Sequence, residues 1–182
     1  MEWLNEPGSW SHSGKQIIVK TSPKTDFWRT THYGFIHDNG HFYFERVNKD
    51  FVVETKIRGN YKDTYDQAGL MIRADENHWI KTGIEYVDGV QNLSAVVTHK
   101  YSDWSFTPLV NSPEVFQLRI ERCKEAIQIA YLDEHAHYVL FRIAYFPIVQ
   151  DIQVGIMCAS PQGNGYEVIF EDYQLIQQAQ QS

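Results

Sequence analysis

The stretch that decides the fold is Tyr65–Trp104, with the sequence YDQAGLMIRADENHWIKTGIEYVDGVQNLSAVVTHKYSDW. It predicts three consecutive β-strands at residues 67–73, 79–86 and 92–99, joined by two polar turns. Side chains point alternately to the two faces of a strand, so apolar residues such as Leu70 fall on one face. The pattern predicts a meander of three strands with one apolar face and one polar face.

The polar face of these strands gathers side chains of several kinds. Its members are an amide, a guanidinium, an indole, an ammonium, a carboxylate and a hydroxyl, from Gln67, Arg73, Trp79, Lys81, Glu85 and Thr98. A sugar is bound by an aromatic plate under its ring and by planar polar side chains at its rim. Trp79 or Trp104 would be such a plate. The set also fits a solvated face on which Arg73 or Lys81 pairs with Glu85 or Glu54 across strands.

Outside this stretch, alternating residues predict eight more strands. They lie at residues 16–20, 41–47, 51–58, 115–122, 126–132, 138–144, 152–159 and 166–176. Residues 106–113, with two prolines, are expected to be a loop. About eleven strands, with no amphipathic helix long enough to cover a sheet, predict an antiparallel two-sheet sandwich or a barrel. We expect one domain over residues 1–176 and a disordered glutamine-rich tail at residues 177–182.

Composition limits the partners that this chain can have. Its 182 residues, 43% of them hydrophobic, suit one domain with a sizeable core. The net charge of −7 argues against nucleic acid or an anionic membrane as a partner, because phosphate binding needs a basic surface. No apolar run reaches the roughly 18 residues of a membrane span, and the first residues lack the pattern of a signal peptide. We therefore expect a cytoplasmic protein in which Cys123 and Cys158 are reduced, structural thiols.

Three motifs in the sequence resemble a known family. They are Asp66-Gln67-Ala68-Gly69-Leu70, Trp79-x-Lys81-x-Gly83-x-Glu85-Tyr86 and Ser102-Asp103-Trp104-Ser105. In this order they resemble the domain of unknown function 1349 family, which has a fungal regulation of enolase protein among its members, from Trp10 to about Gln174. The resemblance implies a concanavalin A-like jelly-roll sandwich with one convex and one concave sheet, in which ligands lie across the concave sheet. It implies no particular reaction.

The polar face and the resemblance together favour a non-catalytic binding domain with a site for a carbohydrate or a similar small polar ligand. The third motif, expected at the end of a strand, adds Asp103 and Trp104 at the mouth of the groove. Alternatively, Asp103 accepts backbone N–H groups in an Asx turn and Trp104 folds over the sheet edge. The predicted ligand-binding residues are Gln67, Arg73, Trp79, Lys81, Glu85, Thr98, Asp103 and Trp104.

Two other functions stay open at this point. The family resemblance suggests a regulatory, protein-interaction domain in carbon metabolism, with a metabolic enzyme as its partner. A retaining glycoside hydrolase would need two carboxyl groups about 5 to 5.5 Å apart. The Glu-x-Asp-x-(x)-Glu strand motif that glucanases of this superfamily use is absent, and Glu85 and Asp88 fall on opposite faces. A pair from different strands, such as Glu54 with Glu85, is the remaining way to build a catalytic site.

The sequence predicts neither a cofactor nor a metal site. The eight histidines are scattered, and the pair His135-x-His137 has no readable third ligand. The segment Gln162-Gly163-Asn164-Gly165 lacks the lysine and the following helix of a phosphate-binding loop.

Overall fold

The computed structural model describes residues 1–147, 149 and 151–178, which form sixteen β-strands. Fourteen strands belong to two seven-stranded antiparallel sheets, and the other two form a short separate ribbon. Within the described ranges, no helix is long and apolar enough to cross a membrane. The predicted all-β, two-sheet sandwich is confirmed.

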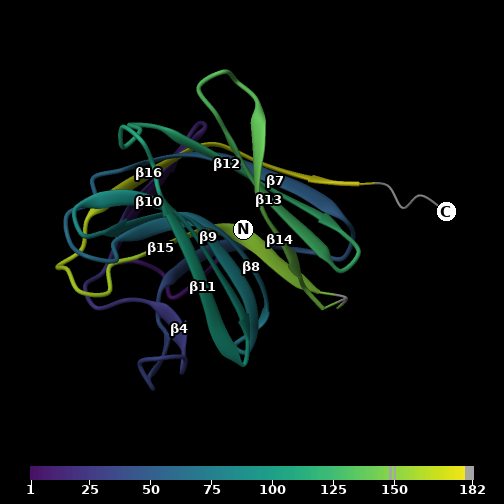
Figure 1. The fold of residues 1–182 in the computed structure, drawn as a ribbon, viewed down its shortest axis with the longest axis horizontal. Helices are drawn as coiled ribbons and strands as arrows, with labels where there is room; N and C mark the ends of the chain where they lie inside the picture. Colours follow the sequence, from purple (N-terminus) through teal and green to yellow (C-terminus); the bar gives the residue numbers. More distant parts are fainter. Residues whose placement is uncertain (148, 150, 179–182) are drawn as a thin grey trace.

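The first sheet has the order β1-β6-β15-β8-β9-β10-β11. Its strands are β1 (Glu2–Leu4), β6 (His41–Val47), β15 (Ile152–Ala159), β8 (Gln67–Asp75), β9 (His78–Val87), β10 (Val90–His99) and β11 (Tyr101–Pro108). The second sheet has the order β14-β13-β12-β7-β16-β3-β2. Its strands are β14 (Tyr138–Tyr145), β13 (Ala126–Leu132), β12 (Phe116–Cys123), β7 (Phe51–Gly59), β16 (Glu167–Gln177), β3 (Gln16–Lys20) and β2 (Ser9–Ser13). Figure 1 shows these two layers packed face to face.

The main hydrophobic core lies between the two sheets. From β8, β9 and β10 it takes the apolar side chains that the alternation predicted, among them Leu70, Ile80 and Leu93, all fully buried. Burying this face forces the alternate residues of the same strands onto the other side of the first sheet. We call that side, which faces away from the second sheet, the outer face.

A ribbon of two short strands, β4 (Phe27–Arg29) and β5 (Ile36–Asp38), lies beside the outer face. It is seen as the purple hairpin next to the first sheet in Figure 1. Phe27 and Trp28 pack with Met71, Trp79 and other outer-face residues in a second, smaller core cluster. The ribbon therefore covers part of a face that would otherwise be open to solvent.

The eleven predicted strands are all present, with ends within two residues of those expected. The prediction of a loop at residues 106–113 was wrong in part, because β11 extends to Pro108 and pairs with β10 along its length. The short strands β1, β2, β4 and β5 were missed, since segments of three to five residues carry little alternation. The expected fraying at Gln177 is also wrong, because this residue ends β16 and pairs with Phe51. The rest of the expected tail, residues 179–182, lies outside the described residues.

Candidate functional site

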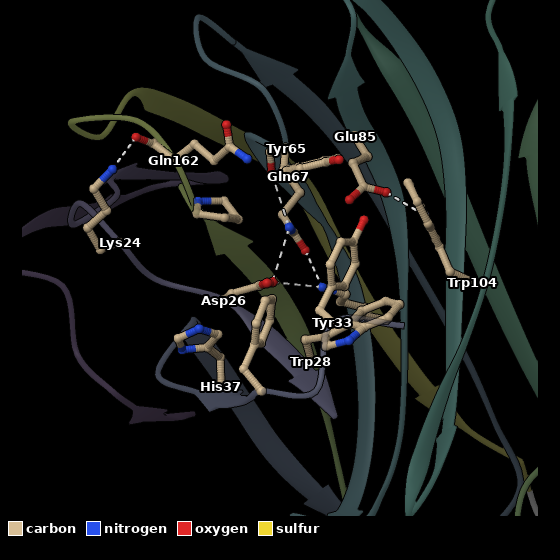
Figure 2. Close-up of a pocket in the computed structure, with 13 residues that line it drawn as sticks. Lys24, Asp26, Trp28, Tyr33, His37, Tyr65, Gln67, Glu85, Trp104 and Gln162 are labelled. Atoms are coloured by element: carbon tan, nitrogen blue, oxygen red, sulfur yellow. Dashed lines mark hydrogen bonds and ion pairs between the residues drawn. The ribbon is translucent and has the colours of Figure 1, made fainter. Parts of the chain in front are cut away.

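A cavity of about 370 Å³ opens on the outer face, between the first sheet and the segment that carries the β4–β5 ribbon. Figure 2 shows its lining side chains converging from several parts of the chain. They are Lys24, Asp26, Trp28, Tyr33, Phe35 and His37 of the covering segment, Gln67, Lys81, Glu85 and Trp104 of the sheet, Tyr65 in the turn before β8, and Pro161 and Gln162. The cavity is thus built on a rigid sheet and closed by loops.

Three side chains on the cavity floor form one hydrogen-bonded unit. Lys81 Nζ donates to Gln67 Oε1 at 2.6 Å and to Asp26 Oδ1 at 3.1 Å. Gln67 Nε2 donates to Asp26 Oδ1 at 3.4 Å and to the carbonyl oxygen of Tyr65 at 3.1 Å. The ammonium and the carboxylate are nearly buried, with side-chain exposures of 5% and 16%. Because each of the three side chains is hydrogen-bonded to the others, their positions are fixed before any ligand binds.

Glu85 forms the second polar group of the floor. Its Oε2 accepts hydrogen bonds from Ser94 Oγ at 2.7 Å and from Trp104 Nε1 at 2.8 Å. Figure 2 shows its other oxygen turned toward Tyr33 and Tyr65. Burial raises the pKa of Glu85, while the nearby Lys81 ammonium and the two hydrogen bonds oppose that rise. Glu85 is therefore a carboxyl group that is anchored by one oxygen and presents the other to the cavity.

Gly83 separates Lys81 from Glu85 on the outer face of β9. Its φ of 153° is one that residues with a side chain rarely adopt. A Cβ atom at this position would lie 2.2 Å from the carbonyl oxygen of Ala68. The glycine thus lets β8 and β9 approach closely and leaves no side chain between the two polar groups of the floor.

Aromatic rings form the walls above this polar floor. The rings of Trp28 and Trp104 meet edge to face at a centroid distance of 6.4 Å, and Tyr65 and Trp104 do so at 6.1 Å. Tyr33 and Phe35 stack at 5.3 Å and are 43% and 41% exposed. Exposed aromatic faces beside fixed polar groups are the arrangement that binds the C–H face and the hydroxyls of a sugar.

Tyr65 is held in a strained backbone conformation at the cavity. Its φ is 70°, and its backbone N–H donates to the carbonyl oxygen of Tyr86 at 2.7 Å. The neighbouring Tyr33 hydroxyl, together with partial burial, raises the pKa of Tyr65 to about 12. Its hydroxyl is therefore neutral at physiological pH and serves as a hydrogen-bonding group. Strained residues of this kind cluster at functional sites.

The structure brings four of the eight predicted site residues to the cavity: Gln67, Lys81, Glu85 and Trp104. It places the other four elsewhere. Trp79 is fully buried beneath Phe27 at the covered end of the face, so it offers no plate to a ligand. Thr98 is also fully buried and shares a hydrogen bond of 2.9 Å with Ser102.

Arg73 and Asp103 take part in ion pairs away from the floor. Arg73 donates twice to Asp38, at 2.7 and 2.8 Å, and so ties the end of β5 to the sheet. Asp103 lies on the alternate side of β11 from Trp104, and its Oδ1 is 3.4 Å from Arg142 Nη2. The alternative of an Asx turn at Asp103 is wrong, because this residue is in the middle of a strand.

The cross-strand ion pairs considered for a solvated face are not formed. Arg73 and Lys81 instead form ion pairs with Asp38 and Asp26 of the covering segment. Glu54 lies on β7 in the second sheet and accepts a hydrogen bond from Tyr138, so it does not pair with Glu85. The carboxyl group that shares the cavity with Glu85 is Asp26.

Sequence reasoning missed the contribution of residues 24–37 and of Tyr65. The available signal was the density of aromatic residues over 27–37, FWRTTHYGFIH, in a segment without strand alternation. Nothing local in those residues shows which face of which sheet they cover. Among the residues that the structure describes, no three His, Cys, Asp or Glu side chains are arranged to hold a metal ion. Cys123 and Cys158 are both unpaired.

Comparison with known proteins gives a family and a set of relatives. The family described as "Protein of unknown function (DUF1349)" matches residues 3–178. "Regulation of enolase protein 1" of Saccharomyces cerevisiae is 38% identical over 173 residues, which are 95% of this chain and 87% of that protein. A crystal structure described as "a functionally unknown protein from Saccharomyces cerevisiae" has a TM-score of 0.93 and 36% identity. The match covers 98% of this chain and 97% of that chain.

More distant structures are similar in fold alone. The GH43 BlXynB protein from Bacillus licheniformis has a TM-score of 0.72 at 15% identity, over 95% of this chain and 36% of that chain. The carbohydrate binding module CBM66 from Bacillus subtilis has a TM-score of 0.59 at 11% identity, over 95% and 94% of the two chains. These similarities confirm the concanavalin A-like jelly-roll sandwich implied by the sequence motifs.

Proposed function

The chain belongs to the DUF1349 family, and from that premise we propose that it is a non-catalytic binding domain whose outer-face cavity takes a carbohydrate or a similar small polar ligand. The observation that carries the proposal is the buried polar floor of Gln67, Lys81 and Glu85 beneath aromatic walls. Polar groups are buried at a cost unless they are paired. A protein that only needed stability would fill this space with apolar side chains.

The size and shape of the cavity support a small ligand. Its volume of about 370 Å³ is at the lower end of the range for small-molecule sites. Lys24 Nζ donates to the carbonyl oxygen of Gln162 at the rim, opposite the wall formed by Trp28 and Trp104. Contacts on both sides thus limit the opening, which suits a single sugar ring. The proposed setting is the cytoplasm, as the sequence led us to expect.

A glycan array tests this function. We expect the wild-type protein to bind at least one class of sugar and Trp104→Ala to bind it about five- to tenfold more weakly, because an aromatic contact is worth about 1 to 1.5 kcal/mol. Tyr101→Ala is the matched control, since Tyr101 is on the same strand, is 64% exposed and does not line the cavity. A folded wild-type protein that binds no glycan would contradict the proposal, as would equal losses in the two variants.

A second candidate is a regulatory protein-interaction domain in carbon metabolism, with a metabolic enzyme as partner. Two observations favour it: the similarity to a relative named for regulation of enolase, and an apolar edge on the second sheet. On β14, Leu140, Ile143 and Tyr145 are 53%, 62% and 60% exposed. Capture of one stoichiometric enzyme from a lysate, lost in Ile143→Lys but kept in Trp104→Ala, would favour this function over sugar binding.

A further inference from the structure

Resting on the proposed function, we infer that the cavity selects an uncharged sugar ring that donates hydroxyl hydrogens, and that it rejects acidic and phosphorylated sugars. The inference comes from the polar atoms of the floor that are still free after the protein's own hydrogen bonds are counted. Most of these atoms are acceptors. A ligand must therefore bring donors, and a carboxylate or a phosphate dianion brings none.

The donors of the floor are almost fully used within the protein. Gln67 Nε2 gives its two hydrogens to Asp26 and to the backbone of Tyr65, and Gln67 Oε1 is taken by Lys81. Lys81 has three hydrogens and gives two of them to Asp26 and Gln67. A single ammonium hydrogen is left for the ligand, from a group that already has its counter-charge.

The acceptors of the floor are in excess. The hydrogen bonds to Asp26, from Phe27, Lys81 and Gln67, all end on Oδ1, which leaves Oδ2 for the ligand. Glu85 likewise accepts the hydrogen bonds from Ser94 and Trp104 on Oε2, and its Oε1 points into the cavity. Two carboxyl oxygens of cavity-lining residues are thus without a hydrogen bond from any described residue, against one remaining N–H of Lys81. Vicinal hydroxyls match this set, because each can donate to a carboxylate and accept from the ammonium.

The charges of the floor exclude an anion for a second reason. Lys81 and Asp26 neutralise each other, whereas Glu85 makes no ion pair with any described residue. Glu85 is only 7% exposed, so a like charge placed beside it would interact through a medium of low dielectric and would be repelled strongly. An uncharged ring avoids this repulsion.

Matched sugar pairs test the inference. The probes are methyl β-D-glucoside with methyl β-D-glucuronide, the corresponding galactose pair, and the neutral, uronic, sialylated and phosphorylated members of a glycan array. We expect the wild-type protein to prefer the neutral member of any pair that it recognises by at least about tenfold. Equal or tighter binding of the acidic member would overturn the inference and leave the proposed function standing. Absence of binding to every probe would overturn the proposed function, and the inference with it.

Two isosteric variants test the cause of the selectivity. Glu85→Gln keeps an oxygen for Ser94 and Trp104 and turns an amide donor toward the cavity, and Asp26→Asn keeps Oδ1 for Phe27 while removing the charge that balances Lys81. We expect each to lower the neutral-to-acidic preference by about threefold or more. Tyr101→Ala should leave it unchanged. A preference that stays at the wild-type value in both folded variants would contradict the inference, and if one variant fails to fold the other decides.

Discussion

At the residue scale, two tryptophans on the same face of the first sheet have different environments. Trp79 is fully buried under the ribbon, with its indole N–H among the buried groups that have no partner, whereas Trp104 is half-buried at the cavity and bonds Glu85. We predict that Trp79→Ala lowers the free energy of unfolding by roughly 3 to 5 kcal/mol, as for other large side chains removed from a core. Urea titration followed by circular dichroism measures this loss. A stable Trp79→Ala variant with weakened sugar binding would mean that Trp79, not Trp104, faces the ligand.

Glu85 gives a pH prediction whose sign follows from its environment. Burial raises its pKa in the folded protein above the ordinary value of 4.5. The folded state then holds this proton more tightly than the unfolded state, so its contribution to stability is present at pH 4 and below and is lost as pH rises through the raised pKa. Lys81 opposes the shift and Asp26 adds to it.

We therefore predict that Glu85→Gln loses part of this pH dependence. Its stability relative to the wild-type protein should rise between pH 4 and neutral pH, because glutamine is never ionised. Urea unfolding of both proteins at matched pH values gives the comparison. A difference that is flat with pH, or that changes in the opposite direction, would show that Glu85 is at least as easily ionised in the fold as in the unfolded chain.

The sequence was a good guide to which side chains share a face and a poor one to which of them meet a ligand. Alternation placed Gln67, Arg73, Trp79, Lys81 and Glu85 on one side of β8 and β9, and the structure agrees. Whether each of these residues is buried or lines the cavity depends on how the segment of residues 24–37, which is 30 to 60 positions away in the chain, covers the face. Periodicity within a strand carries no information about such a long-range contact.

At the scale of elements, the β4–β5 ribbon turns an open sheet face into a cavity. Its attachment rests on the packing of Phe27 and Trp28 and on the double hydrogen bond from Arg73 to Asp38. Arg73 is buried with a side-chain exposure of 8%, and Asp38 is one-third exposed. This ion pair is consequently a stronger contact than those on the surface.

We predict that Asp38→Ala lowers the free energy of unfolding by about 1.5 to 3 kcal/mol, because a buried guanidinium loses its carboxylate. Sugar binding should weaken in the same variant, since the ribbon carries the wall of the cavity. Thermal unfolding and calorimetry report the two effects. The control is Arg46→Ala, whose partner Glu2 is 3.4 Å away and also exposed, and it should cost about 1 kcal/mol or less. Similar costs for both variants would contradict an anchoring role for the Arg73–Asp38 pair.

Strands with a clear alternation were predictable, whereas β11 and four strands of three to five residues were not. Strands of seven or more residues with at least one buried face, such as β6 and β13, were found with their correct ends. Strand β11 was missed because it is an edge strand with a mostly exposed, polar sequence that ends at Pro108. Its pairing with β10 depends on the whole of β10 being free on that side, which no local pattern indicates.

At the scale of the whole molecule, one core cluster takes side chains from both large sheets. This continuity supports the prediction of a single domain over residues 1–176. We therefore expect unfolding to be cooperative, with coincident transitions by tryptophan fluorescence and by far-UV circular dichroism. Separated transitions would indicate that the sandwich consists of parts that unfold independently.

The measurement that tests the central claim most directly is a two-dimensional NMR titration of the five indole N–H groups of Trp3, Trp10, Trp28, Trp79 and Trp104. The titrants are D-glucose, D-galactose, D-mannose and D-xylose. If the cavity is a sugar site, at least one of them should shift the signals of Trp28 and Trp104, which line it, and leave those of Trp3 and Trp10 in place. Shifts confined to Trp3 and Trp10, or none with any of these sugars, would contradict the account.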